Sequence, residues 1–273
     1  MSRTSRITDL GRGLFIWLAL ALCGLAQAAD PQNGQLLAGL GGCASCHTVE
    51  GQQAYAGGYA IETDWGTYYG PNLTPDDEHG LGTWSLADFT AAMREGRSPR
   101  GHSYYPAFPY PSFTGMTDED LRDLWAFFKT VAPAATANRE HEPSAIAKGR
   151  WKLGFWRMGG FKEGPLLTDD RGEYLVDAVG HCGECHTPRG GMGRTRDGRY
   201  LQGNPDGPEP APSLIGLDWS ERDWRRFLKR GALPDGDVVG GVMGDIVKQG
   251  TSQLSDADRE ELADYLMVIG AQW

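Results

Sequence analysis

The sequence predicts an all-α protein made of two similar domains in tandem, joined by long loops. A five-residue pattern, C-x-x-C-H, occurs once in each half of the 273-residue chain. Further landmarks recur in the same order at offsets of 135 to 139 residues. Between the landmarks, apolar residues follow the spacing of amphipathic helices. The 39 glycines and 16 prolines indicate that the connections between helices are long.

The duplication is recognised from pairs of matched segments. The pairs are Leu36-Leu37 with Leu175-Val176, Cys43 with Cys182, Trp84-Ser85 with Trp219-Ser220, and Met116-Thr117 with Leu254-Ser255. Because four landmarks keep one order at nearly one offset, the second half of the chain repeats the plan of the first.

Each copy contains three predicted helices. The first runs up to the C-x-x-C-H motif. The second follows Ser85 or Ser220, which are natural N-cap residues, and Gly96 is a suitable stop in the first copy. The third begins after Thr117 or Ser255, and Pro133 ends it in the first copy.

The two C-x-x-C-H motifs predict two covalently attached haem groups. Two thiols three positions apart can form thioethers to the two vinyl groups of one porphyrin, and the following histidine then becomes the proximal iron ligand. The residues expected to hold the haems are Cys43, Cys46, His47, Cys182, Cys185 and His186. We expect long loops to wrap around each haem.

Two other interpretations of C-x-x-C, a redox dithiol and half of a zinc site, fit the sequence less well. A redox dithiol is expected within a βαβ pattern, which the sequence lacks. Half of a zinc site does not explain why a histidine follows directly in both copies. A chance C-x-x-C-H is plausible once and much less plausible twice in a duplicated context, so the sequence favours haem.

Residues 1–28 are predicted to be a signal peptide. Arg3, Arg6 and Arg12 precede an apolar run at 14–25, and Ala26-Gln27-Ala28 fits a cleavage site. Of the 5 cysteines, Cys23 would leave with this segment and the others all lie in the motifs. We therefore expect an exported, periplasmic protein, either free or peripheral to the inner membrane.

The remaining chain divides into two domains and a connection. The expected boundaries are 30–132 for the first cytochrome-like domain, 133–165 for the linker and 166–273 for the second domain. The linker is rich in aromatic residues, so we expect it to pack on both domains. The formal net charge of −10 argues against nucleic acid as a partner.

A sixth iron ligand is expected from the loop before the last helix of each domain, and methionine is usual in small c-type cytochromes. In the second domain Met243 is the only methionine of that loop. In the first domain Met116 is the candidate, although it could instead pack as a hydrophobic staple at the helix start. His102 or no protein ligand are the alternatives.

The small all-α domain with C-x-x-C-H after its first helix resembles the class I cytochrome c fold. Residues 69–76 (YGPNLTPD), 80–85 (GLGTWS), 105–110 (YPAFPY) and 180–189 (GHCGECHTPR) resemble the cytochrome c subunits of membrane-associated alcohol, aldehyde and gluconate dehydrogenases. Those subunits typically carry three haems, and many have methionine where Phe108 stands.

The resemblance implies an electron carrier rather than an enzyme. It would take single electrons from a dehydrogenase partner and pass them to a downstream cytochrome, quinone or oxidase. The alternative is a di-haem enzyme such as a peroxidase, which would need one iron that is open on one side. A thiosulfate dehydrogenase with a His/Cys-ligated iron is disfavoured, because no thiol remains after haem attachment.

Overall fold

Each half of the chain is built around a pair of crossing helices. The computed structural model describes residues 28–207 and 210–271, so the expected signal peptide lies almost entirely outside the described residues. In the first half α1 (Pro31–Leu40) packs against α5 (Asp118–Thr130). In the second, α7 (Arg171–Glu173) continues into the π-helical η1 (Tyr174–Val179), and α7 packs against α11 (Asp256–Ala271).

A glycine stands at each of these crossings. A Cβ atom on Gly34 would lie 2.0 Å from the carbonyl oxygen of Asp123, and one on Gly172 would lie 2.2 Å from that of Glu261. Both distances are far below van der Waals contact. The two helices of each pair therefore approach so closely that no side chain fits between them.

In the sequence, the remaining helices of each half fall between the two members of its crossing pair. The first half contains α2 (Cys43–His47), α3 (Leu86–Glu95) and α4 (Tyr110–Phe113). The second half contains α8 (Cys182–His186), η2 (Asp197–Arg199), α9 (Glu221–Arg230), α10 (Gly241–Gln249) and η3 (Thr251–Gln253). The short α6 (Lys152–Met158) lies on the connection between the halves.

The predicted helix starts are confirmed by their caps. Ser85 and Ser220 each form a capping box with the aspartate three residues on. Gly96 adopts a left-handed backbone with φ of 58° and ends α3. The Thr117 side chain accepts the backbone N–H of Asp120 at the start of α5.

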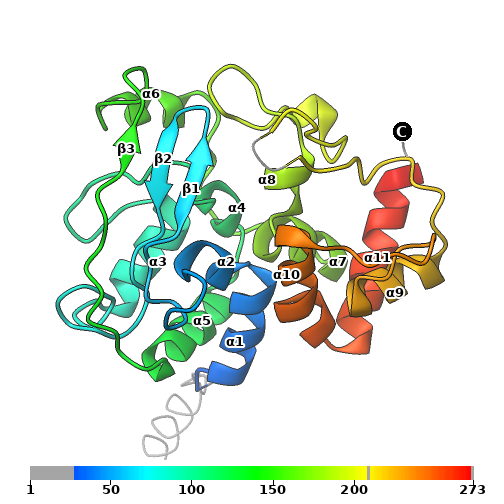
Figure 1. Cartoon of the computed structure of the whole chain (residues 1–273), viewed down its shortest axis with the longest axis horizontal. Coiled ribbons are helices and arrows are strands. Elements are labelled where there is room, and N and C mark those ends of the chain that lie inside the picture. Colours follow the sequence, from blue (N-terminus) through cyan, green and yellow to red (C-terminus); the bar gives the residue numbers. More distant parts are fainter. Residues whose placement is uncertain (1–27, 208–209, 272–273) are drawn as a thin grey trace, which may run out of the picture.

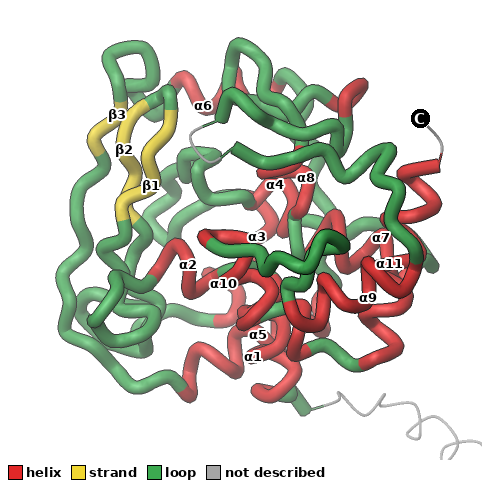
Figure 2. Tube along the Cα trace, turned by 45° about the vertical axis from the view of Figure 1, so that its right-hand side comes forward, coloured by secondary structure: helices red, strands yellow, loops and turns green. Residues whose placement is uncertain are grey.

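The expectation of a purely α-helical protein needs a correction, because a small antiparallel sheet is also present. It contains β1 (Ala60–Thr63), β2 (Gly66–Tyr69) and β3 (Glu142–Pro143) in that order. The sheet lies at one edge of the molecule (Figures 1 and 2). β-branched and aromatic residues favour β1 and β2, but β3 comes from a segment far along the chain.

The two halves pack against each other through the segments that precede their last helices. α4 of the first half contacts η1 of the second, and α10 of the second contacts α1 and α2 of the first. Figure 1 shows α10 beside α1 and α2 near the middle of the molecule. A Cβ atom on Gly39 would lie 2.0 Å from the carbonyl oxygen of Gln249. One hydrophobic core therefore extends across both halves.

The connecting segment contacts both halves. The Arg157 guanidinium donates to the carbonyl of Glu95 in the first half. The Trp156 Nε1–H donates to the carbonyl of Met192 in the second half, at 2.9 Å. Among the described residues, no helix is both long and apolar enough to cross a membrane.

Candidate haem centres

Each C-x-x-C-H motif forms a short helix that begins at a left-handed residue. Gly42 precedes α2 with φ of 60°, and His181 precedes α8 with φ of 40°. Residues three positions apart lie on the same face of a helix. The two thiols of each motif can therefore reach one flat group, as covalent haem attachment requires.

The histidine of each motif is oriented by a hydrogen bond to a proline carbonyl. His47 Nδ1 lies 2.7 Å from the carbonyl oxygen of Pro71, and His186 Nδ1 lies 2.8 Å from that of Pro212. A carbonyl can only accept, so Nδ1–H donates in both cases. The Nε2 atom is then left with a lone pair that can bind a metal, the arrangement usual for metal-bound histidines.

Burial keeps both imidazoles neutral. It lowers the pKa of His47 to about 4, against a smaller opposing effect of the hydrogen bond to Pro71. Burial also lowers the pKa of His186. Only the neutral ring has a lone pair to offer, so both histidines are in the ligating form at neutral pH.

The loops beneath the two motifs are built alike. Thr48 Oγ1 accepts the backbone N–H of Tyr55, and Thr187 Oγ1 accepts that of Leu201, both at 3.0 Å. Tyr55 and Leu201 have left-handed backbones, with φ of 63° and 55°. This backbone is rare outside glycine. Two residues on, Gly57 donates to the carbonyl of His47 and Gly203 to that of His186.

This donor set fits two covalent haems. Each half offers two thiols on one helical face and a neutral histidine with Nε2 free. In the described part of the chain, no group of three or more histidine, cysteine, aspartate or glutamate side chains is arranged to hold a bare metal ion.

The two motifs lie next to each other in space. The His181 ring, directly before the second motif, donates through Nε2 to the carbonyl of Gly41, just before the first, at 3.1 Å. The same ring packs edge-on against Phe113 at 5.0 Å. Cys46 lies close enough to Cys185 for that thiol to raise its pKa, after the larger effect of burial. Two attached haems would therefore approach each other at this junction.

The structure separates the candidates for the sixth ligand by burial. Met243 lies in α10, which is a helix rather than the expected loop, and is partly buried. Met116 is 1% exposed among apolar residues of the core. His102 is exposed at the turn between residues 98 and 103.

A partly buried cluster of one carboxylate and two tyrosines beside the second motif was not predicted from the sequence. Asp177 accepts hydrogen bonds from the hydroxyls of Tyr200 and Tyr265, the latter at 3.3 Å. Burial raises the pKa of Asp177 to about 6. Tyr200 and Tyr265 lie 23 and 88 positions from Asp177 in the chain, and no local pattern joins them.

Two C-x-x-C-H motifs on short helices, each with a histidine that has its Nδ1–H bound to a carbonyl, are the arrangement of a c-type cytochrome. Family models agree with this class: a cytochrome c model matches residues 31–132, and a model of subunit III of cbb3-type cytochrome c oxidase matches residues 168–266. The chain therefore contains two cytochrome c domains.

Curated relatives identify the family more closely. A "Diheme cytochrome c-type" protein of Cereibacter sphaeroides is 41% identical over 89% of this chain and 86% of its own length. The cytochrome c subunit of the quinone-dependent alcohol dehydrogenase of Gluconobacter oxydans is 39% identical, and that of the gluconate 2-dehydrogenase of Pantoea cypripedii is 38% identical. These two matches span 99% and 93% of this chain, but only 63% and 64% of the relatives' own lengths.

The chain belongs to the di-haem cytochrome c family. It carries two covalently bound haem c groups, and the resemblance to dehydrogenase cytochrome subunits is confirmed.

Proposed function

We propose that this protein is an exported, periplasmic di-haem cytochrome that relays single electrons. It would accept them from a dehydrogenase partner and pass them to a downstream cytochrome, quinone or oxidase. The observation that carries the proposal is the adjacency of the two motifs, through the His181–Gly41 hydrogen bond and the Cys46–Cys185 proximity. Electron relay needs two redox centres held close together.

We propose that His47 and His186 are the proximal ligands, and that each haem is attached through the two cysteines of its motif. Met243 is proposed as the sixth ligand in the second domain. Met116 stays a prediction for the first domain. Its complete burial by apolar neighbours favours the other interpretation, a hydrophobic staple at the start of α5.

When bound, each haem iron gains or loses one electron at a time. The carbonyls of Pro71 and Pro212 hold the rings of His47 and His186 in place. Contacts of α4 with η1 and of α10 with α1 and α2 hold the two motifs beside each other. No dinucleotide fingerprint and no nucleophile triad is present in the sequence, which supports a carrier rather than a separate catalyst.

The proposed electron donor is a dehydrogenase. Relatives named as cytochrome subunits of alcohol, gluconate and fructose dehydrogenases support a dehydrogenase as electron donor. The chain spans 63% and 64% of the length of the alcohol and gluconate dehydrogenase subunits.

Three measurements test the proposal. Mass spectrometry of the mature protein should show two haem adducts, and a redox titration should show two one-electron steps. Affinity purification from the periplasmic fraction should recover a dehydrogenase that reduces the protein. Free thiols at the motifs, or a single haem adduct, would contradict the proposal.

A further inference from the structure

Each half carries a short hairpin directly after its second long helix. Gly96 and Gly231 begin the hairpins with left-handed backbones, φ of 58° and 68°. The carbonyl of Gly96 accepts the N–H of Tyr104 at 2.7 Å, and that of Gly231 accepts the N–H of Val239 at 2.8 Å. The hairpins 96–104 and 231–239 therefore match at a constant offset of 135 residues, bond for bond.

The matched hairpins set the register of the segments that follow. Continuing at the same offset, Phe108 of the first half corresponds to Met243 of the second. Both side chains are partly buried and pack against the shared core. A phenyl ring, which has no lone pair for iron, thus stands where the other half has a thioether.

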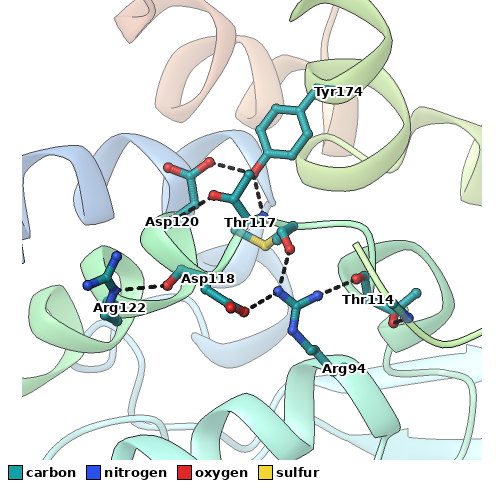
Figure 3. A network of polar contacts seen from close by, with 9 residues as sticks. Arg94, Thr114, Thr117, Asp118, Asp120, Arg122 and Tyr174 are labelled. Atoms are coloured by element: carbon teal, nitrogen blue, oxygen red, sulfur yellow. Dashed lines mark hydrogen bonds and ion pairs between the residues drawn. The ribbon is translucent and has the colours of Figure 1, made fainter. Parts of the chain in front are cut away.

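Met116 does not compensate for this exchange. Its counterpart directly before the last helix is Leu254, and both are buried, at 1% and 7% exposure. The carbonyl of each accepts a hydrogen bond from an arginine, Arg94 or Arg259. Figure 3 shows Arg94 also bound to Thr114 and Asp118 at this helix start. Met116 therefore has the structural role of a residue that cannot bind iron.

His102 does not compensate either. It lies in the turn of the first hairpin, where its carbonyl accepts the N–H of Ser98 at 2.9 Å, and its side chain is exposed. Its counterpart is Asp237, whose carbonyl accepts the N–H of Leu233 at 2.8 Å. Both residues close the hairpin turn through their backbones.

The side chains around Phe108 are aromatic. Its ring centroid lies 5.7 Å from that of Tyr104, 6.2 Å from that of Tyr110 and 5.9 Å from that of Phe113. These apolar surroundings suit a small uncharged ligand better than an anion, because an unpaired charge is costly to bury.

We propose that the iron held by His47 has no protein ligand on its second face and binds small uncharged molecules there, whereas the iron held by His186 is closed by Met243. This inference rests on the proposed function, since it presumes both haems and Met243 as a ligand. It makes the first domain a ligand-binding centre and the second a closed relay.

Carbon monoxide is the probe, because it binds ferrous haem only where a coordination position is free or readily freed. The full-length holoprotein, with two haems verified by mass, is reduced and titrated with carbon monoxide, and uptake is followed by absorption difference spectra. We expect one molecule bound per protein. Phe108→Met should weaken this binding by at least tenfold, and Met243→Phe should raise uptake to two. Met93→Leu, a buried methionine of α3, is the matched control and should leave uptake at one.

The spin state of the oxidised protein is a second readout that needs no variant. We expect one high-spin and one low-spin ferric haem by electron paramagnetic resonance. Two low-spin haems and no uptake of carbon monoxide, in protein that carries both haems, would overturn the inference and leave the proposed function standing. Binding of one carbon monoxide molecule that is not weakened in Phe108→Met would also overturn the inference. So would binding that is absent from the unmodified protein and appears only in Met116→Leu. Fewer than two haem adducts would instead refute the proposed function.

Discussion

In both motif histidines, a hydrogen bond from Nδ1–H leaves Nε2 able to bind a metal. In each half a proline carbonyl, 24 or 26 residues further along the chain, accepts the Nδ1–H. This bond selects the tautomer with a lone pair on Nε2 and fixes the orientation of the ring. The chemistry of each centre therefore depends on a backbone oxygen that no side-chain substitution removes.

The sixth ligand offers a test in the second domain. Replacing Met243 with histidine should keep the iron six-coordinate and lower the midpoint potential of one haem, because imidazole is the stronger donor. The axial ligands set haem potentials over a range of roughly 0.8 V, so a fall on the order of 0.1 V is expected. A spectroelectrochemical titration measures both midpoints. If Met243 is not a ligand, neither midpoint will move.

The buried Asp177 makes stability depend on pH. Burial raises its pKa from 3.8 to about 6, so the folded protein binds more protons than the unfolded one between these values. The free energy of unfolding should therefore fall as pH rises through this window, by about 3 kcal/mol. Urea unfolding curves below and above the window measure the change.

Asp177→Asn is the matched variant, because an amide keeps an oxygen for the hydroxyls of Tyr200 and Tyr265 and does not titrate. The pH dependence between 3.8 and about 6 should be reduced in this variant. An unchanged slope would show that other carboxyl groups cause it.

Among the secondary-structure elements, the crossing helices depend most directly on single residues. α1 meets α5 at Gly34, and α7 meets α11 at Gly172, in each case against a backbone carbonyl. Backbone atoms cannot yield as the end of a flexible side chain can. The close approach that positions each C-x-x-C-H motif therefore requires glycine.

Gly34→Ala should destabilise the protein by about 1–3 kcal/mol, because the added methyl would lie 2.0 Å from the carbonyl of Asp123 and the helices would have to separate. Gly154→Ala in α6 is the control. Its added methyl meets no atom within 4 Å, so a gain of a few tenths of a kcal/mol is expected from helix propensity. Equal effects of the two changes on urea unfolding would refute the close crossing.

In the molecule as a whole, the two halves form one structural unit. The core cluster contains buried residues of both, and α10 lies against α1 and α2 of the other half. Polar contacts add to this: the Tyr174 hydroxyl of η1 donates to Asp120 and accepts the N–H of Thr117, the latter at 3.1 Å (Figure 3). The adjacency of the haem motifs follows from this packing.

One cooperative transition is therefore expected when the holoprotein unfolds in urea. Tyr174→Phe removes the hydroxyl partner of Asp120 Oδ2 and of the Thr117 N–H, and should lower the midpoint, at a cost of about 1–3 kcal/mol. The transition should stay single when followed by far-ultraviolet circular dichroism and by haem absorption. Two separate midpoints would show that the halves unfold independently. Tyr59→Phe, on a side chain that is 38% exposed, should change little.

Features that depend on neighbours along the chain were recognised from the sequence. Each C-x-x-C-H motif and each of the caps at Ser85, Ser220 and Gly96 lies within a few residues, where local chemistry decides the structure. The duplication was recognised because such local patterns recur in one order at nearly one offset. Covalent attachment needs only the spacing of two thiols and a histidine. The class of protein and its cofactors could therefore be predicted before any fold was known.

Contacts between distant segments were decided only by tertiary packing. β3 joins the sheet from a segment more than 70 residues beyond β2, the proline carbonyls meet the histidines across a loop, and α10 crosses onto α1. The register that makes Phe108 the counterpart of Met243 arises in the same way. So does the burial that gives Met116 a core position. Residue patterns record which side chains are apolar, whereas the identity of their neighbours depends on how segments far apart in the chain fill a common interior.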